Sequence, residues 1–194
     1  MSAYSLQDFI HDMDALITAN LTPVRLLEKA EPLLARLIAS PKAIPDEYRR
    51  PSGTGPNPMH ASYRLHDGAN GLTIGTVVWA PGQYLAPHDH SSWGMVGTLE
   101  HATTETRYRR LDDGTNKEFA KLEKDRVSLR KKGETYILIP GVDEIHDVLN
   151  DSDRLAVDIH LYGLDIRKIE RNIFDPQTGK IKRFLTDPSG TAKQ

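Results

Sequence analysis

The chain has 194 residues, contains no cysteine and carries a formal net charge of -2 at pH 7. A chain of this length buries roughly 70% of its unfolded surface, so it can fold as one domain without disulfide bonds. The small net charge gives no field that favours nucleic acid or an anionic membrane, and the lack of cysteine excludes a thiolate metal site and a cysteine nucleophile. We expect a single domain over residues 1–194 that acts on a small molecule through histidine, carboxylate and hydroxyl groups.

Apolar residues recur at helical spacing in the first 40 residues, which predicts a helical cap over residues 1–40. Ser5 is suited to cap a first helix, and Thr22 followed by Pro23 opens a second one. Pro32 either kinks this second helix or starts a third. We expect these helices to cover a sheet and to perform no chemistry.

Residues 41–60 contain five prolines and two glycines, a composition that favours an irregular connector. The chain then consists of short runs rich in β-branched and aromatic residues, separated by turn signals and without a long helical pattern. These runs are 62–65, 72–80, 93–100, 103–110, 135–139, 145–149 and 155–162, and the turn sequences at 112–114 and 150–153 resemble hairpin turns. The pattern predicts a mainly β fold, an antiparallel barrel or sandwich over residues 61–185, followed by a polar tail at 186–194.

The N-terminal segment does not resemble a targeting signal. Its first ten residues include Asp8 and lack a basic stretch followed by an apolar run, and no run of about 18 apolar residues occurs in the sequence. We therefore expect a cytoplasmic protein that does not bind membranes. The sequence leaves the oligomeric state open.

Two histidines lie in a segment, residues 81–94, that is punctuated by glycine and proline and reads as extended chain. Alternate side chains of a strand point to the same face, so His88 and His90 would project together with Asp89 on the opposite face. Two neutral imidazoles on one face can chelate a transition metal. A third ligand would complete a catalytic site.

The segment 133–150 has the outline of the second cupin motif, including His146 and Asn150. The segment 82–90 is similar to the opening of the first cupin motif, although Gly94 stands where that motif expects a glutamate. A cupin with three histidines and no glutamate resembles the thiol dioxygenases, the family of cysteine dioxygenase and 3-mercaptopropionate dioxygenase. The resemblance implies a cupin barrel, of the double-stranded β-helix or jelly-roll type, in which His88, His90 and His146 bind Fe(II).

Two further segments extend the resemblance. Asp158, His160 and Tyr162 are similar to the family's Ser-x-His-x-Tyr strand, with aspartate in place of serine. The segment around Arg171 is similar to the one whose arginine binds the substrate carboxylate in the 3-mercaptopropionate type. The resemblance implies that Tyr162 and His160 act beside the iron, that Asp158 fixes the tautomer of His160 and favours its imidazolium, and that Arg171 binds the carboxylate. Arg167 is the reserve candidate for that role.

One departure from the family bears on the substrate. Cysteine dioxygenases place a carboxylate-binding arginine on an early strand, where this chain has Ser62, although a slip of two residues would bring Arg64 there. This counts against cysteine as the substrate.

Trp93 and the run 103–110 are expected to have structural rather than chemical roles. Trp93 is expected to wall the substrate pocket or to pack in the core rather than to perform chemistry. The run 103–110, with Arg107, Arg109 and Arg110, is expected to be a solvated strand face.

These observations predict a non-haem iron dioxygenase that adds O2 to the sulfur of a small carboxylate-bearing thiol, such as 3-mercaptopropionate or mercaptosuccinate, to give a sulfinate. Neutral imidazoles leave the charge of the metal available to an anion, and iron is favoured over zinc because sulfur oxidation needs redox chemistry. Two alternatives stay open: a three-histidine cupin dioxygenase that cleaves a carbon–carbon bond of a dicarbonyl compound, and a non-catalytic cupin that binds a metal or small ligand.

Overall fold

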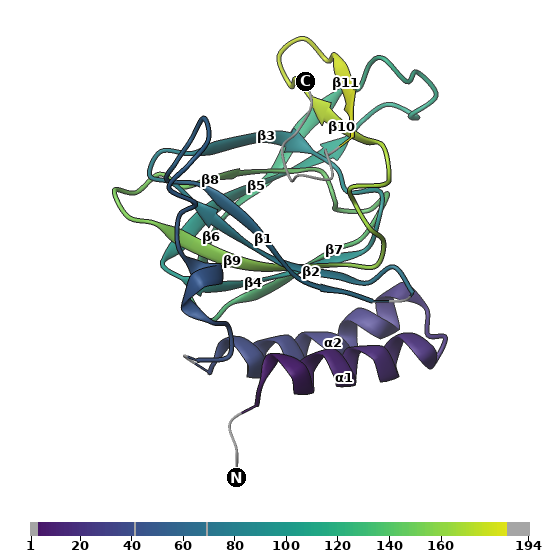
Figure 1. Cartoon of the computed structure of the whole chain (residues 1–194). Coiled ribbons are helices and arrows are strands. Elements are labelled where there is room, and N and C mark those ends of the chain that lie inside the picture. The colour runs from purple at the N-terminus through teal and green to yellow at the C-terminus, as the bar shows by residue number, and fades with distance from the viewer. Residues whose placement is uncertain (1–3, 41, 69, 186–194) are drawn as a thin grey trace.

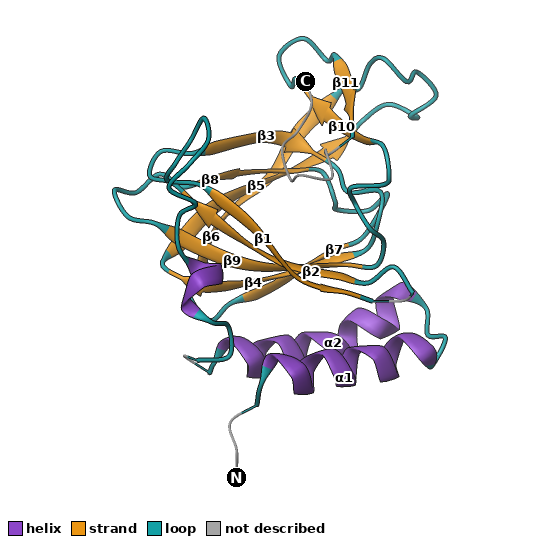
Figure 2. Cartoon of the chain, in the orientation of Figure 1, coloured by secondary structure: helices purple, strands orange, loops and turns teal. Residues whose placement is uncertain are grey.

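Two antiparallel β-sheets face each other, and two N-terminal helices cover the outer face of one of them (Figure 1). The computed structural model describes residues 4–40, 42–68 and 70–185, so the tail predicted at 186–194 lies outside the described residues. Strands dominate the chain and the helices stay at one side (Figure 2). The expected mainly β cupin architecture with a helical cap is confirmed.

The helical cap consists of α1 (Leu6–Thr18) and α2 (Pro23–Ile38). Ser5 and Asp8 form a capping box at the start of α1, in which each side chain accepts a hydrogen bond from the other residue's backbone N–H. Pro32 lies inside α2, which runs through it as one helix rather than dividing there. Proline removes one helical hydrogen bond, and we attribute the continuity to the buried leucines on the face that α2 packs against the sheet.

The first sheet lies on the helices and has the strand order β1-β2-β9-β4-β7. Its strands are β1 (Ala61–Asp67), β2 (Thr73–Trp79), β9 (Ala156–Tyr162), β4 (Gly94–Glu100) and β7 (Thr135–Leu138). The largest apolar cluster is formed between this sheet and the helices, with Ile159 and Leu161 of β9 packed near Phe9 and Leu34. The opposite face of β9 therefore points between the two sheets.

The second sheet has the strand order β11-β10-β3-β8-β5-β6. Its strands are β11 (Ile181–Phe184), β10 (Arg171–Phe174), β3 (Tyr84–His88), β8 (His146–Leu149), β5 (Ala102–Arg110) and β6 (Leu122–Lys131). The strands β6, β10 and β11 were not among the predicted runs. Of the two predicted hairpin turns, residues 112–114 lie in the long connection between β5 and β6, which pair as antiparallel neighbours, whereas residues 150–153 connect β8 to β9 in the other sheet and form no hairpin.

The connector before β1 is largely irregular, with one short 3-10 helix, η1 (Asp46–Arg49). Its Tyr48 carbonyl accepts a hydrogen bond from Thr76 of β2, which ties the connector to the first sheet. Among the described residues, no helix has the length and apolar character needed to cross a membrane.

Candidate metal centre

Three histidines meet on the inner side of the second sheet. His88 is the last residue of β3 and pairs in register with His146, the first residue of β8, while His90 follows two positions after His88. All three side chains are buried. Each offers a ring nitrogen, and these three atoms lie within 4.8 Å of one another. The Nε2 atoms of His90 and His146 are 3.1 Å apart.

The second ring nitrogen is held in place at two of these histidines. His88 Nδ1 lies 2.9 Å from the Ala86 carbonyl oxygen, and His146 Nδ1 lies 2.9 Å from Glu105 Oε1. A carbonyl or carboxylate oxygen only accepts, so Nδ1 carries a hydrogen in both rings and Nε2 is the atom left to bind a metal. Metal ligands in proteins commonly have this arrangement, which fixes the orientation of the ring.

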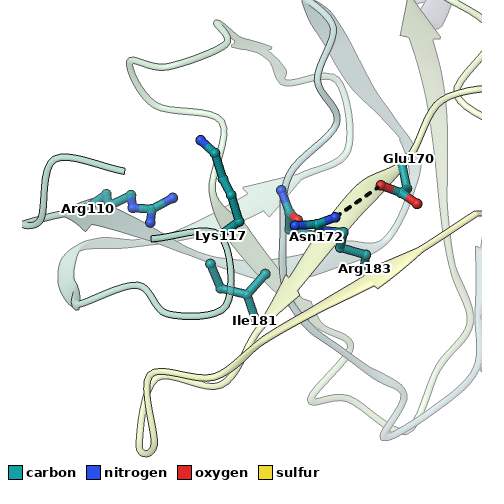
Figure 3. A pocket seen from close by; sticks show the side chains of 6 residues that line it. All are labelled: Arg110, Lys117, Glu170, Asn172, Ile181 and Arg183. Atoms are coloured by element: carbon teal, nitrogen blue, oxygen red, sulfur yellow. Dashed lines mark ion pairs between the residues drawn. The ribbon is translucent and has the colours of Figure 1, made fainter. Parts of the chain in front are cut away.

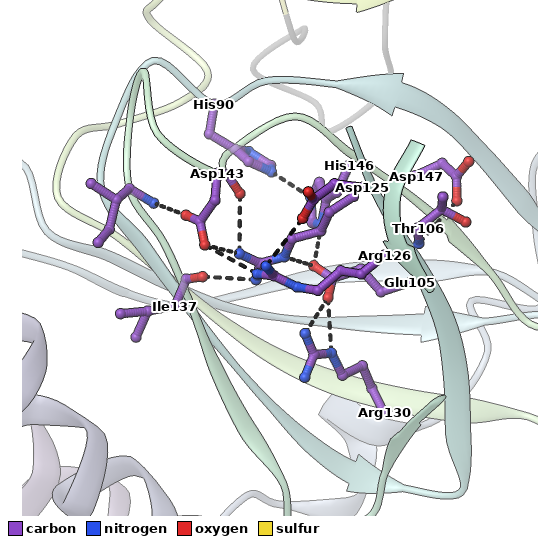
Figure 4. Close-up of polar contacts among 12 residues, drawn as sticks. His90, Glu105, Thr106, Asp125, Arg126, Arg130, Ile137, Asp143, His146 and Asp147 are labelled. Carbon is purple, nitrogen blue, oxygen red and sulfur yellow. Dashed lines mark hydrogen bonds and ion pairs between the residues drawn. The ribbon is translucent and has the colours of Figure 1, made fainter. Parts of the chain in front are cut away.

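Glu105 belongs to a buried cluster of charges behind His146 (Figure 4). Its carboxylate accepts from Arg107 Nε at 3.0 Å and from Arg130 Nε at 2.8 Å as well as from His146. Arg107 also contacts Asp143. Burial alone raises the pKa of Glu105, but His146, Arg107 and Arg130 lower it to about 2. The histidine is thus oriented by a carboxylate that stays charged.

The donor set fits a transition metal. Burial lowers the pKa of both His88 and His90 well below its ordinary value, so these rings are neutral, as metal ligands must be. Three imidazole nitrogens suit iron, zinc, copper or nickel, and protein ligands from three histidines leave further coordination positions for small molecules. The geometry and the protonation of the site therefore match a metal centre.

The inner face of β9 lies opposite the three histidines. His160 Nδ1 is 3.0 Å from the Tyr162 hydroxyl oxygen, and the Tyr162 ring stacks on His90 with centroids 4.7 Å apart. Burial raises the pKa of Tyr162, whereas burial and the nearby His146 lower the pKa of His160 to about 3. At neutral pH this face therefore presents a neutral imidazole and a protonated phenol.

Asp158 does not take the role expected for it. Its Oδ2 accepts a hydrogen bond from Trp79 Nε1 at 2.9 Å, and no contact of the carboxyl with His160 occurs among the described residues. Burial raises the pKa of Asp158 to about 7, although the bond from Trp79 opposes this shift. The expectation that Asp158 holds the tautomer of His160 and favours its imidazolium is wrong, because the carboxyl is directed to the indole and the imidazole is neutral.

A cavity of about 410 Å³ opens between the sheets. It is lined by the three histidines together with His160, Tyr162, Arg64, Arg167 and Arg171. Arg171, on β10, is buried, and its guanidinium lies 4.3 Å from the centroid of the Phe184 ring. Burial lowers the pKa of Arg171, but the group stays a cation at neutral pH. An anion inside the cavity would therefore find this cation beside the histidines.

Two other arginines, Arg64 and Arg167, line the same cavity. Arg167 is paired with Asp165 through two hydrogen bonds, from Nε at 2.9 Å and from Nη2 at 2.8 Å. Arg64, on β1, contacts Asp67 at 2.8 Å, whereas its Nη1 is buried without a hydrogen-bond partner among the described residues. Arg64 pairs in register with Gly75, which in turn pairs with His160, so all three share the inner face of the sheet.

Trp93 lies outside the cavity lining. It packs against the main apolar cluster, and its indole covers Gly163 so closely that a Cβ there would lie 2.1 Å from Trp93 Nε1. Of the two places expected for Trp93, the structure shows the core and not the pocket wall.

Several residues around the site were missed from the sequence. The run 103–110 was expected to be a solvated strand face, but Glu105 and Arg107 are buried. Of its three arginines, only Arg109 has an exposed side chain, which pairs with Glu123 at the surface. Opposite charges two residues apart on a strand share a face and can pair, which is the signal that would have indicated this cluster. No pattern in the sequence indicated the hydrogen bond from Asn172 Nδ2 to Asp89 Oδ2, at 2.6 Å.

The family described as cysteine dioxygenase type I matches residues 17–175 of this chain. The match covers most of the chain and includes every strand except β11, the three histidines and Arg171. The resemblance to the cupin thiol dioxygenases that the motifs indicated is confirmed.

Similar solved structures include oxalate oxidase in complex with the substrate analogue glycolate, with 18% sequence identity over 60% of this chain and 56% of that chain and a TM-score of 0.46. A protein with a double-stranded β-helix domain from Klebsiella pneumoniae has 17% identity over 71% of this chain and 91% of that chain, with a TM-score of 0.41. A sugar phosphate isomerase of the cupin superfamily from Silicibacter pomeroyi has 16% identity over 75% and 86%, with a TM-score of 0.46. The chain thus spans little more than half the length of the oxalate oxidase chain that it matches.

Proposed function

The chain belongs to the cysteine dioxygenase type I family, and from this premise we propose that it is a non-haem iron dioxygenase that converts a small carboxylate-bearing thiol to its sulfinate. One observation carries the proposal. Three buried histidines converge on one point inside a cavity that Arg171 also lines. The site can therefore hold a metal and an anionic ligand of a few atoms together.

The three Nε2 atoms of His88, His90 and His146 would hold the ion. A ferrous ion there supplies the redox chemistry that joins O2 to sulfur, and neutral ligands leave its charge available to a thiolate. In the net reaction a thiolate and O2 give a sulfinate: the O–O bond breaks, two S–O bonds form, and the four electrons lost by sulfur reduce the two oxygen atoms. No other reductant is needed.

Arg171 would bind the carboxylate of the substrate. A guanidinium donates two parallel hydrogen bonds to a carboxylate, which fixes the position and orientation of that end of the molecule. With the carboxylate held at Arg171 and the sulfur at the metal, the distance between them selects the length of the carbon chain. We therefore propose 3-mercaptopropionate, or a close relative of it, as the preferred substrate.

Tyr162 and His160 would form the polar wall beside the reacting atoms. The raised pKa of Tyr162 keeps its hydroxyl protonated, so it can donate to an oxygen of the substrate or of O2. His160, 3.0 Å from that hydroxyl, orients it. This assigns Tyr162 to hydrogen bonding and His160 to positioning.

Mercaptosuccinate is a second candidate substrate, favoured by Arg64. Arg64, on β1, lines the same cavity from the first sheet, where its guanidinium would supply a donor to a second carboxylate. Replacing Arg64 by alanine would then weaken the turnover of mercaptosuccinate but not that of 3-mercaptopropionate. Equal rates with mercaptosuccinate before and after the substitution would exclude this second carboxylate site.

The proposal is tested by metal analysis and oxygen uptake of the purified protein. The protein loaded with iron should consume O2 with 3-mercaptopropionate or mercaptosuccinate, faster than with cysteine or with cysteamine, which has no carboxylate. Uptake with a diketone and none with any thiol would instead support carbon–carbon cleavage. A bound metal without turnover of any of these compounds would support a non-catalytic cupin.

A further inference from the structure

Asp89 lies between the two ligands His88 and His90, and its side chain is directed away from the metal centre. The carboxylate accepts two hydrogen bonds from Asn172, one from the backbone N–H at 2.8 Å and one from Nδ2 at 2.6 Å. The Asp89 backbone N–H donates to the Asn172 carbonyl oxygen at 3.2 Å. Three hydrogen bonds thus join the residue between two metal ligands to the residue that follows Arg171.

The strand β10 separates two hollows of the molecule. Arg171 and Ile173 line the substrate cavity, whereas Asn172 lines a second hollow of about 430 Å³ on the other side of the strand (Figure 3). This alternation is the one expected of a strand. The second hollow is bordered by charged side chains such as Arg110, Lys117 and Arg183, whereas Phe174, two residues further along β10, packs into a small apolar cluster with Ala120 and Ile181.

On one side β10 pairs along its whole length with β11, from Arg171 with Phe184 to Phe174 with Ile181. On the side of the metal centre, its register with β3 consists of one pair, Ile173 with His88. The far end of the hairpin is tied separately, where the Ala120 N–H donates to the Gly179 carbonyl oxygen at 2.8 Å. The bonds between Asp89 and Asn172 are therefore a direct polar connection between the metal-binding segment and the neighbourhood of Arg171.

We propose that Asp89 and Asn172 form a clamp that sets the distance between the three-histidine centre and the Arg171 guanidinium, and thereby the chain length of the thiol acid that fits. The inference rests on the proposed function, because it takes the sulfur to lie at the metal and the carboxylate at Arg171. Neither clamp residue touches the substrate. Both act as positioning residues, through His88, His90 and Arg171.

The test measures binding in the absence of turnover. Zinc binds thiolates without redox chemistry, so calorimetry on the zinc-loaded protein gives the Kd of mercaptoacetate, 3-mercaptopropionate and 4-mercaptobutyrate. The wild-type protein should prefer one length. In Asn172→Ala, which loses one charge-assisted bond, we expect the Kd of the preferred acid to rise about 10-fold and the three values to converge. The Kd of cysteamine, which has no carboxylate, should change less than the Kd of the preferred acid.

Two further variants separate positioning from a general loss of structure. Arg183→Ala removes a side chain that borders the same second hollow and does not contact Asp89, so it should keep the wild-type length preference. Asn172→Asp places two carboxylates together and should lose the preference. The double variant Asp89→Asn/Asn172→Asp exchanges acceptor and donor and should recover it.

The outcomes distinguish the clamp from the proposed function. A wild-type length preference that survives in Asn172→Ala, or a double variant that behaves like Asn172→Asp alone, would overturn the clamp. Equal affinities of the wild-type protein for the three acids would overturn it as well, since there would be no selection to explain. Failure of the iron-loaded wild-type protein to consume O2 with any thiol would instead overturn the proposed function.

Discussion

The wall of the cavity that carries His146 is fixed by buried charges, whereas Arg171 lies on β10, a short strand next to the edge strand β11. Behind His146, Glu105 accepts hydrogen bonds from two arginines, and β8 lies between β3 and β5. Beside Arg171, β10 has four pairs with β11, which lead away from the metal centre, and its link to β3 consists of one register pair and the bonds between Asp89 and Asn172. The metal side is thus held by several buried groups, whereas the link from the substrate side to the metal side depends on a few contacts.

The largest effect is expected from removing the central carboxylate of the metal side. Glu105→Ala leaves the buried Arg107 and the half-buried Arg130 without this carboxylate, which should lower the free energy of unfolding by about 3–5 kcal/mol and weaken metal binding roughly 10- to 100-fold. Urea denaturation and metal titration of the apo protein measure the two quantities. Glu105→Gln, which can still accept from His146, is the matched control and should bind metal more tightly than the alanine variant. Unchanged stability in Glu105→Ala would mean that this side is not held by its charges.

On the substrate side, Arg171→Ala should change substrate binding more than stability. Loss of hydrogen bonds to a charged group, about 1.5–3 kcal/mol, should raise KM for 3-mercaptopropionate roughly 10- to 100-fold. Steady-state oxygen uptake gives KM, with cysteamine as the control substrate, because a thiol without a carboxylate makes no use of the arginine. Arg171→Lys keeps the charge without the planar guanidinium, so its KM for 3-mercaptopropionate should lie between the values of the wild type and of Arg171→Ala. Equal losses with both thiols would remove Arg171 from the carboxylate site.

The first sheet, which lies opposite both of these walls, contains a carboxyl whose pKa is shifted in the opposite direction to that of Glu105. The pKa of Asp158 is raised to about 7 by burial, so the unfolded state releases this proton at lower pH than the folded state does. The group contributes stability below pH 4, and that contribution is lost as the pH rises toward 7, by roughly 1.4 kcal/mol per pH unit at most.

Asp158→Asn should remove this pH dependence and make the protein more stable than the wild type at pH 8, by on the order of 1 kcal/mol. Urea denaturation of both proteins at pH 5 and pH 8 provides the comparison. A stability difference that is the same at both pH values would show that Asp158 is not protonated in the folded protein.

The smallest effect is expected at the second arginine of the substrate side. Arg167 is partly exposed and paired with Asp165, and such pairs contribute about 0–1 kcal/mol. Arg167→Ala should therefore raise KM for 3-mercaptopropionate less than roughly 5-fold. An effect larger than that of Arg171→Ala would assign the substrate carboxylate to Arg167.

Most of the fold could be predicted from the sequence because its strands alternate in character or carry apolar runs. The outward face of β9, with Ile159 and Leu161, and the capping residue Ser5 are examples. The strand β6 was missed because it is mostly exposed and has charges on both faces, so its pairing with β5 rather than an apolar face defines it. Such pairing between distant segments leaves no periodic signal in one sequence.

The cluster of three histidines could be predicted because its motifs keep a fixed spacing, but its surroundings could not. Glu105 lies on a strand that reads as a polar face, and its burial depends on arginines that come from two strands. Arg64 remained ambiguous because β1 has an irregularity between Arg64 and His66, which shifts the register by an amount that the sequence does not specify. Asp158 was assigned to His160 by analogy with serine, whereas the larger carboxyl reaches Trp79.

The central claim is tested most directly by the stoichiometry of the reaction. The iron-loaded protein would be given 3-mercaptopropionate in an oxygen electrode, with the product identified by mass spectrometry after labelling with ¹⁸O₂. One O2 consumed for each sulfinate formed, with both labelled atoms on sulfur and no activity in the metal-free protein, is the predicted result. Oxygen uptake that yields disulfide and hydrogen peroxide, or no uptake with any thiol, would contradict it.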